Sequence, residues 1–191
     1  MEKKIIKFLP VILILVGVIM IIAAKMNESR DKAENRIAYN EYREQNGSEI
    51  KATEPEGPMI GWLSVETDEL DLKYPIYTQS EDEKVTEDYL YKGVVYCTDT
   101  DYPGTGQTII MGHNGLLDKE LFLHLDKLKK GDEAKIVIGS HEYTYVYTDS
   151  RIVLPEEVGI KTGEALVLMS CYPYGQNTHR ILAGFTASEK E

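Results

Sequence analysis

One cysteine and one arginine stand at the facing ends of two apolar runs near the end of the chain. Cys171 ends the run 166–171, and Arg180 lies in the run 180–185. The segment 172–177 between them is rich in turn-forming residues, so we expect the chain to leave one strand at Cys171 and to return on its neighbour. A nearby permanent positive charge favours the thiolate, and a guanidinium can hold a developing oxyanion. The spacing therefore indicates nucleophilic chemistry at Cys171 assisted by Arg180.

A proton carrier for this chemistry is expected at His113. The residue follows the β-branched run 108–111 and stands between Gly112 and Asn114, so its imidazole should lie at a strand end where the chain turns. Imidazole titrates near neutral pH and suits a general acid and base. A lone cysteine is more often a buried small side chain, and a lone histidine is more often a loop residue. The combination of the three residue types favours catalysis.

These features resemble the sortases, the cysteine transpeptidases of Gram-positive cell surfaces. The strongest likeness is in residues 171–180, Cys-Tyr-Pro-Tyr-Gly-Gln-Asn-Thr-His-Arg, which are similar to the signature of the pilus-building class C enzymes. Residues 121–132 also resemble the segment that follows the catalytic histidine in those enzymes. The resemblance covers about residues 61–185. It implies that Cys171 is the nucleophile, His113 the general acid and base, and Arg180 the donor to the substrate carbonyl.

The resemblance leaves the subclass open between class B and class C. Class C enzymes usually carry an Asp-Pro-aromatic lid before the barrel and a second hydrophobic anchor at the C-terminus, and we find neither pattern in this sequence. The forms Gly61-Trp62-Leu63, Tyr74-Pro75-Ile76 and Gly112-His113-Asn114 look more like class B. Because segment 52–57 holds no lid motif, we expect an open active site.

The implied activity is cleavage of a Leu-Pro-x-Thr-Gly-like sorting signal and transfer of the acyl group to an amine. The implied partners are surface proteins or pilins with a C-terminal sorting signal, and the amine would come from peptidoglycan or a pilin lysine. No cofactor and no metal are expected. The stretch 98–101, Thr-Asp-Thr-Asp, could hold calcium, as in some family members, but it lacks the further ligands of a calcium loop. We interpret it as a solvated turn.

Two other interpretations stay open from the sequence. In the first, a non-catalytic β interaction domain tethered to a membrane would bridge Cys97 and Cys171 in a disulfide, which an extracellular location permits. In the second, the chain would be an L,D-transpeptidase-like wall enzyme, although the arginine of those enzymes follows the cysteine by two positions. Two free thiols in the folded domain would exclude the first interpretation.

The start of the chain has the composition of a membrane anchor. Residues 8–24 carry no charge, follow three lysines and precede Lys25, and residues 5–6 extend the apolar stretch. This length exceeds the usual apolar core of a cleaved signal peptide, so an uncleaved signal-anchor over residues 5–24 is predicted. The lysines ahead of it predict a single-pass protein of the cell membrane with a cytoplasmic N-terminus and an extracellular catalytic domain.

Charge and composition divide the chain into three expected parts. These are a cytoplasmic tip with the signal-anchor (1–26), a charged stalk or linker (27–57) and a catalytic domain (58–191). The stalk is either partly helical or disordered, and in both cases it would space the domain from the membrane. Beyond residue 25 the chain keeps 17 basic and 31 acidic residues, a formal net charge of −14, which argues against nucleic acid as a partner.

Short apolar runs separated by turns predict a mainly β catalytic domain. We expect eight strands, at 59–65, 70–77, 93–96, 108–111, 134–138, 143–147, 165–170 and 180–185. The resemblance implies the eight-stranded sortase-type β-barrel with a few short helices, preceded by the transmembrane helix. Helices are predicted at 85–91 and 118–129, the second because three leucines recur at helical spacing. On its strand His179 should point away from Arg180, and His124 and His141 are expected at the surface.

Overall fold

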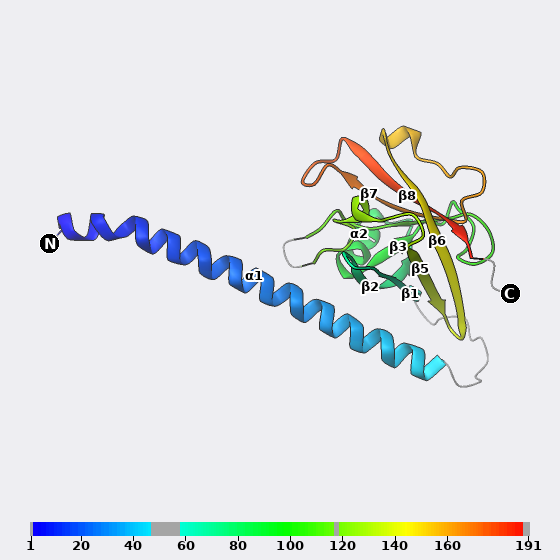
Figure 1. The fold of residues 1–191 in the computed structure, drawn as a ribbon, viewed down its shortest axis with the longest axis horizontal. Coiled ribbons are helices and arrows are strands. Elements are labelled where there is room, and N and C mark those ends of the chain that lie inside the picture. Colours follow the sequence, from blue (N-terminus) through cyan, green and yellow to red (C-terminus); the bar gives the residue numbers. More distant parts are fainter. Residues whose placement is uncertain (1, 47–57, 117–118, 189–191) are drawn as a thin grey trace.

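The structure is a computed structural model that describes residues 2–46, 58–116 and 119–188 of the 191-residue chain. It consists of one long helix, α1 (Glu2–Asn46), and a closed β-barrel that lies against the C-terminal half of this helix (Figure 1). Residues 47–57 of the expected stalk lie outside the described residues, and so does the segment 52–57, on which the expectation of an open active site rests.

The barrel contains eight strands, and they confirm the eight that the sequence predicts. Around the barrel they follow the order β1-β2-β3-β4-β7-β8-β6-β5. Their bounds are β1 (Met59–Glu66), β2 (Asp71–Thr78), β3 (Val94–Tyr96), β4 (Thr108–Met111), β5 (Glu133–Ile138), β6 (His141–Val153), β7 (Leu166–Tyr172) and β8 (His179–Ala187). Inward-facing apolar side chains fill the interior, and the largest fully buried ones include Leu63, Tyr74, Ile110, Leu168 and Phe185.

Two neighbouring strand pairs are parallel, and the remaining pairs are antiparallel. The parallel pairs are β2 with β3 and β4 with β7. A parallel pair needs a crossover connection, because the chain must return to the end of the barrel from which it started. Helix α2 (Glu83–Lys92) is part of the first crossover, and the β5–β6 hairpin is part of the second. Because β3 is antiparallel to β4, the end of α2 that leads into β3 lies at the same end of the barrel as the carboxyl ends of β4 and β7.

Helix α2 confirms the helix predicted at 85–91, and its two ends have clear causes. The carboxylate of Asp82 caps the helix by accepting a hydrogen bond of 2.9 Å from the backbone N–H of Lys84. At the other end the N–H of Gly93 donates to the carbonyl of Tyr89 over 2.9 Å. A Cβ at Gly93 would lie 2.4 Å from the carbonyl oxygen of Pro75, so only glycine lets the chain pass this close to β2.

The helix predicted at 118–129 is wrong. In the described part of this segment, residues 119–129 form turns and one short 3-10 helix, η1 (Leu125–Lys127). Leu121 has a φ of 42°, which an α-helix does not accommodate. Leu121, Phe122 and Leu125 are all fully buried in the barrel core. The leucine spacing therefore reflects burial of a turn that closes one end of the barrel, not a helix face.

The two halves of helix α1 differ in composition and in their contacts with the barrel. A window within Val11–Gln45 has a mean hydropathy of 2.2, and its side chains are not buried by the rest of the protein, so this helix could span a membrane. Farther along, Tyr39 is 4% exposed and packs on Trp62 and Val137 of the barrel. The part expected to be a stalk is thus helical up to Asn46 and packed along the barrel. The boundaries at residues 26 and 57 stay predictions.

Candidate active site

The parallel pairing of β4 with β7 brings His113 and Cys171 to the same edge of the barrel. The register places Met111 opposite Met169, and the backbone N–H of Gly112 extends the pairing by donating to the carbonyl of Met169 over 3.0 Å. His113 and Cys171 each stand two residues beyond the matched methionines. Because carboxyl ends of parallel strands meet at one edge, the imidazole and the thiol emerge side by side from neighbouring strands.

Local packing holds this edge in place. The hydroxyl of Ser170, which is 2% exposed, donates to the carbonyl of Gly112 over 2.8 Å. A Cβ at Gly112 would lie 2.8 Å from the ring of Phe122, so the glycine before the histidine allows the barrel-closing turn to pack beneath it. The N–H of Phe122 in turn donates to the carbonyl of His113 over 3.0 Å. The position of His113 is therefore tied both to β7 and to the turn that follows it.

Arg180 enters from the next strand. In the antiparallel pairing of β7 with β8 it stands directly opposite Cys171. One amide oxygen joins the two side chains, because Oδ1 of Asn177 accepts from Nη1 of Arg180 over 2.6 Å and from Sγ of Cys171 over 3.4 Å. His179 instead has its Nδ1 3.0 Å from the hydroxyl of Thr178. Asn177 as the link between thiol and guanidinium was not singled out from the sequence.

One groove of about 570 Å³ contains all three predicted site residues. Its apolar lining residues are Leu90, Met111 and Met169, and its other lining residues come from α2, the strand ends and the β7–β8 turn. The polar or glycine members are Glu87, Gly112, His113, Ser170, Cys171, Gly175, Gln176, Asn177 and Arg180. A larger cavity of about 670 Å³ lies between the loop 104–107 and β6, and neither cysteine nor histidine lines it. The groove thus has the residues for chemistry although it is the smaller of the two.

Comparisons with known proteins identify the family of the chain. Residues 65–186 match the Sortase domain family. The chain belongs to the sortase family. Sortase D of Bacillus subtilis (strain 168) is 33% identical over 92 residues, which cover 46% of this chain and 44% of that protein. The chain thus aligns with less than half the length of this curated relative.

Solved sortase structures share the barrel. Sortase C1 from Streptococcus agalactiae is 29% identical with a TM-score of 0.62, and the match covers 78% of this chain and 76% of that one. Sortase C of Streptococcus pneumoniae is 25% identical with a TM-score of 0.62, covering 87% and 90%. Sortase A from Corynebacterium diphtheriae is 21% identical with a TM-score of 0.61, covering 90% and 93%, and this likeness shows the fold alone. The predicted sortase-type barrel is confirmed.

Helix α2 gives this sortase two residues beside His113 that the sequence analysis missed, and one of them, Glu87, lines the groove. Oε1 of Glu87 lies 3.5 Å from Nε2 of His113, and the ring of Tyr91 lies 5.1 Å from the imidazole at an angle of 52°. Among the described residues, Nε2 of His113 has no hydrogen-bond partner, because the Glu87 carboxylate is close enough for an ion pair but does not form a hydrogen bond with it. The i, i+4 spacing of Glu87 and Tyr91 on one helix face was the available signal. This spacing could not show which strand end the helix face with Glu87 and Tyr91 would contact.

The two cysteines of this sortase have different environments and are not bridged. Both carry free thiols, which removes the interpretation of a disulfide-linked interaction domain. Cys97 is 7% exposed and packs with Ile109, Val167 and Leu182. Burial, together with the charge of Asp99, raises the pKa of its thiol to about 12. Cys97 is therefore a neutral core residue at ordinary pH, whereas Cys171 is half-buried at the groove.

The stretch 98–101, interpreted from the sequence as a solvated turn, is held by local hydrogen bonds. The carboxylate of Asp101 accepts from the N–H of Gln107 over 2.8 Å, and the carbonyl of Asp101 accepts from the hydroxyl of Thr108 over 2.7 Å. The hydroxyl of Thr100 donates to the carbonyl of Cys97 over 2.8 Å. Within the described ranges, no group of three or more His, Cys, Asp and Glu side chains is placed to hold a metal ion.

Proposed function

We propose that this sortase is a membrane-bound cysteine transpeptidase in which Cys171, His113 and Arg180 carry out the chemistry. The observation that carries the proposal is the convergence of these three side chains, from three different strand ends, on one groove. Membership of the sortase family supports it. The nine-residue separation of Cys171 and Arg180 also disfavours an L,D-transpeptidase, because here the pair forms across two strands.

In the first half-reaction the thiolate of Cys171 attacks the carbonyl carbon of the scissile peptide bond. Arg180 donates hydrogen bonds to the carbonyl oxygen as negative charge develops on that atom. In the structure Nη1 of Arg180 donates to Asn177 instead, so this hydrogen bond is exchanged for one to the substrate. His113, in its protonated form, gives a proton to the departing amine nitrogen. The C–N bond breaks, the amine leaves, and a thioester joins the acyl group to Cys171.

In the second half-reaction an incoming amine attacks the thioester carbonyl. Neutral His113 takes the proton that this nitrogen loses, the C–S bond breaks, and the thiolate of Cys171 is restored. The same imidazole serves as acid and then as base, which is why one histidine is sufficient for both steps. No step needs a metal or a cofactor.

The donor we propose is a surface protein or pilin with a Leu-Pro-x-Thr-Gly-like C-terminal sorting signal. The apolar lining residues Leu90, Met111 and Met169 suit the apolar residues of such a signal. The acceptor is an amine of peptidoglycan or a pilin lysine, and a pneumococcal sortase C structure with similar fold is described in terms of pilin substrate specificity. The lysines ahead of the apolar span favour a cytoplasmic N-terminus with the barrel outside the cell.

Mass spectrometry of the intact chain incubated with a sorting-signal peptide tests the proposal. We expect an acyl adduct on Cys171, no adduct on Cys171→Ala, and a normal adduct on the matched control Cys97→Ala. Adding a glycine peptide or a lysine peptide should release the adduct as a new amide and show which amine is preferred. Labelling that persists in Cys171→Ala would contradict the assignment, and hydrolysis with every amine would contradict transpeptidation.

A further inference from the structure

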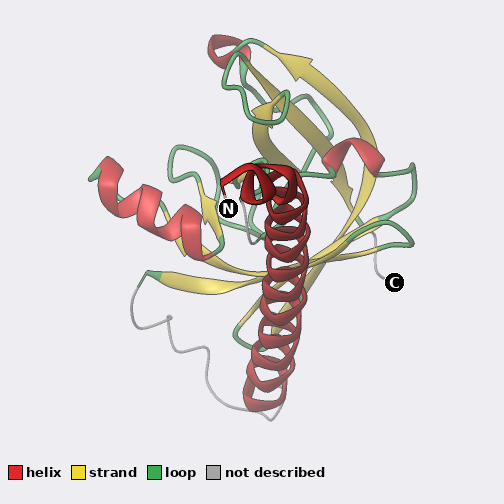
Figure 2. Cartoon of the chain, turned by 90° about the vertical axis from the view of Figure 1, so that its left-hand side faces the viewer, coloured by secondary structure: helices red, strands yellow, loops and turns green. Residues whose placement is uncertain are grey.

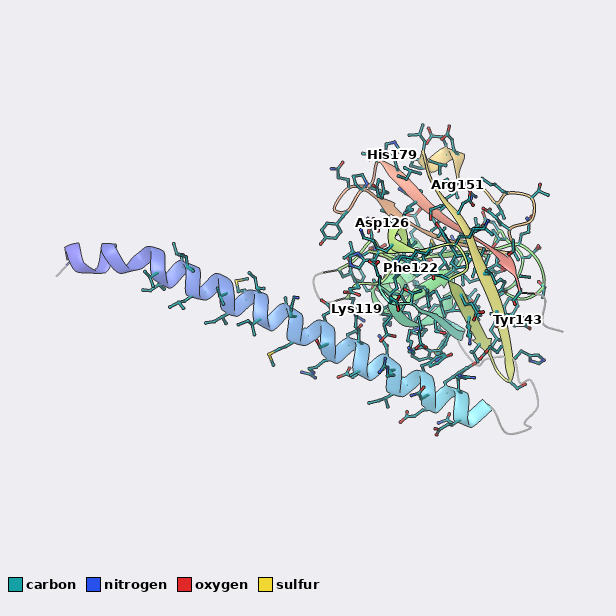
Figure 3. The ribbon with its side chains drawn as sticks, viewed as in Figure 1. Lys119, Phe122, Asp126, Tyr143, Arg151 and His179 are labelled. Carbon is teal, nitrogen blue, oxygen red and sulfur yellow. The ribbon has the colours of Figure 1, made fainter. Side chains whose placement is uncertain are left out.

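Helix α1 is tied to the barrel by contacts that follow a fixed order along the helix. The first contacts reach the turn beyond His113, where Asp31 pairs with Lys119 at 3.2 Å and Lys32 pairs with Glu120 at 2.7 Å. These four side chains are between 19% and 31% exposed. Lys119 lies between the barrel and α1 (Figure 3). The N-terminal end of the docked part therefore meets the end of the barrel that carries the groove.

The middle of the docked part contacts β2 and β1. Arg36 pairs with Asp71, the first residue of β2, at 2.9 Å. Tyr39 packs edge-on against Trp62 of β1, with ring centres 6.0 Å apart, and its hydroxyl lies 3.4 Å from the hydroxyl of Ser64. Tyr39 and Trp62 are 4% and 5% exposed. This packing makes the helix part of the folded domain.

The last contacts reach the opposite end of the barrel. The hydroxyl of Tyr42 accepts from the N–H of Gly139 over 2.9 Å, and Arg43 pairs with Glu142 at 3.0 Å. Gly139 lies in the turn of the β5–β6 hairpin, and Glu142 lies next to this turn at the start of β6. Strand β6 runs in the same direction as β4 and β7, because β6 and β7 are both antiparallel to β8. The turn that precedes β6 therefore lies at the end of the barrel away from His113 and Cys171, which stand at the carboxyl ends of β4 and β7.

The order of contacts fixes which end of the barrel faces the membrane. Ala24, the last residue of the apolar span, precedes Asp31 by seven positions, which is about 10 Å of helix at 1.5 Å per residue. The contacts at Arg43 lie about 18 Å farther along. In Figure 1, α2 and the β7–β8 turn lie on the side of the barrel toward the N-terminus of α1, and Figure 2 looks at this end.

We propose that the docked segment 28–43 of α1 is an orienting strut that holds the catalytic groove toward the membrane surface. The groove then works on peptides tethered to the bilayer, close above the headgroups, and not on chains far out in the wall. This inference rests on the proposed function for its substrate but not for its geometry. A flexible stalk of equal length would leave both the height and the direction of the groove free.

Energy transfer to the bilayer surface tests the orientation without any catalysis. The full-length chain is reconstituted in phosphatidylcholine vesicles that carry an acceptor dye on some headgroups. A donor dye is attached to Cys171, since Cys97 is buried, or to the exposed hairpin turn in a Cys171→Ala, Ser140→Cys variant. We expect transfer to be more efficient from position 171, which should lie roughly 18 Å nearer the surface. Equal transfer, or more efficient transfer from position 140, would overturn the proposal.

An insertion tests the consequence for substrates. Seven helix-forming residues placed after Met26 keep the helical phase and all docking contacts but lift the groove by about 10 Å. The sorting peptide is offered free in solution and attached to a lipid at its C-terminus. We expect the acylation rate to be unchanged for the free peptide and to fall about tenfold for the tethered one. Equal effects on both peptides would overturn the inference that the groove works on peptides tethered to the bilayer. If neither peptide gave an adduct even with the wild-type chain, the proposed function itself would be contradicted.

Discussion

At the scale of single residues, the role proposed for Arg180 depends on the geometry of its guanidinium as well as on its charge. Arg180 directs Nη1 at the amide oxygen of Asn177 and is placed opposite Cys171 across two strands. The planar fork of arginine can donate two hydrogen bonds in one plane, and an ammonium cannot reproduce this arrangement. The role proposed for Arg180 therefore distinguishes a shaped donor from a general source of positive potential.

Replacing Arg180 by lysine should lower kcat/KM for the sorting peptide by about 10²–10³-fold, the usual cost of removing one oxyanion donor. Single-turnover acylation followed by mass spectrometry measures the loss. The rate of Cys171 alkylation by a small thiol reagent serves as a control, because the positive charge is kept. Near-normal acylation by Arg180→Lys would mean that Arg180 contributes only its positive charge and not the geometry of its donors.

Asn177 should contribute by positioning both reactive side chains. Its amide oxygen accepts from the thiol and from the guanidinium, so Asn177→Ala removes the shared acceptor while leaving the charges. The turn is exposed, so we expect a loss of about tenfold in acylation rate, equivalent to roughly 1.4 kcal/mol. Gln176→Ala, in the same turn, is the matched control. Equal small effects of the two substitutions would mean that the amide oxygen has no positioning role.

The sequence was most informative where chemistry and turn signals are local. The strand-ending positions of His113, Cys171 and Arg180 could be read directly, because apolar runs and turn formers lie next to each residue. Glu87 and Tyr91 were missed because their relation to His113 depends on how α2 packs after the crossover to β3. That packing involves residues more than twenty positions apart, which no short pattern encodes.

At the scale of elements, the largest differences from the sequence predictions come from tertiary contacts. Three leucines at helical spacing predicted a helix at 118–129, but burial of Leu121, Phe122 and Leu125 in the barrel end favours a turn instead. The docking of α1 was hidden by its charged composition. Its charges are partnered by barrel residues that are distant in sequence, so segment 28–43 has the composition of a solvated stalk although it packs on the barrel.

Truncating Tyr39 should release the strut without unfolding the barrel. Removing a buried aromatic side chain typically costs about 3–5 kcal/mol, and here the loss falls on the contact of α1 with Trp62 of β1 and Val137 of β5. We expect Tyr39→Ala to abolish hydrogen-exchange protection along residues 28–43 while the barrel amides stay protected. Ile37→Ala, at a position 58% exposed on the same helix, is the matched control and should change stability by less than about 0.5 kcal/mol. Unchanged protection in Tyr39→Ala would mean that the ion pairs alone hold the helix.

At the scale of the whole molecule, acid should weaken the junction of helix and barrel. Burial raises the pKa of Glu120, but its hydrogen bond with Lys32 and the charge of that lysine lower it by more, so the net pKa is below the ordinary value. The same holds for Asp71: burial raises its pKa, but Lys73 and Arg36 together lower it by more, so its net pKa is also below the ordinary value. Both carboxylates therefore contribute to stability above their unfolded pKa values of about 4. That contribution is lost as the pH falls through the lower pKa values of the folded state.

The expected result is a strut that stays docked near neutral pH and loosens below about pH 4, where the unfolded or undocked carboxylates bind protons more readily. Hydrogen exchange of residues 28–43, measured at several pH values against the exchange of the β1 and β2 amides, follows this change. Because a glutamine at position 120 cannot titrate, Glu120→Gln should weaken docking near neutral pH and flatten its acid dependence. Protection of α1 that stays constant from pH 7 to about pH 3 would show that apolar packing around Tyr39, and not the carboxylate pairs, fixes the height of the active site.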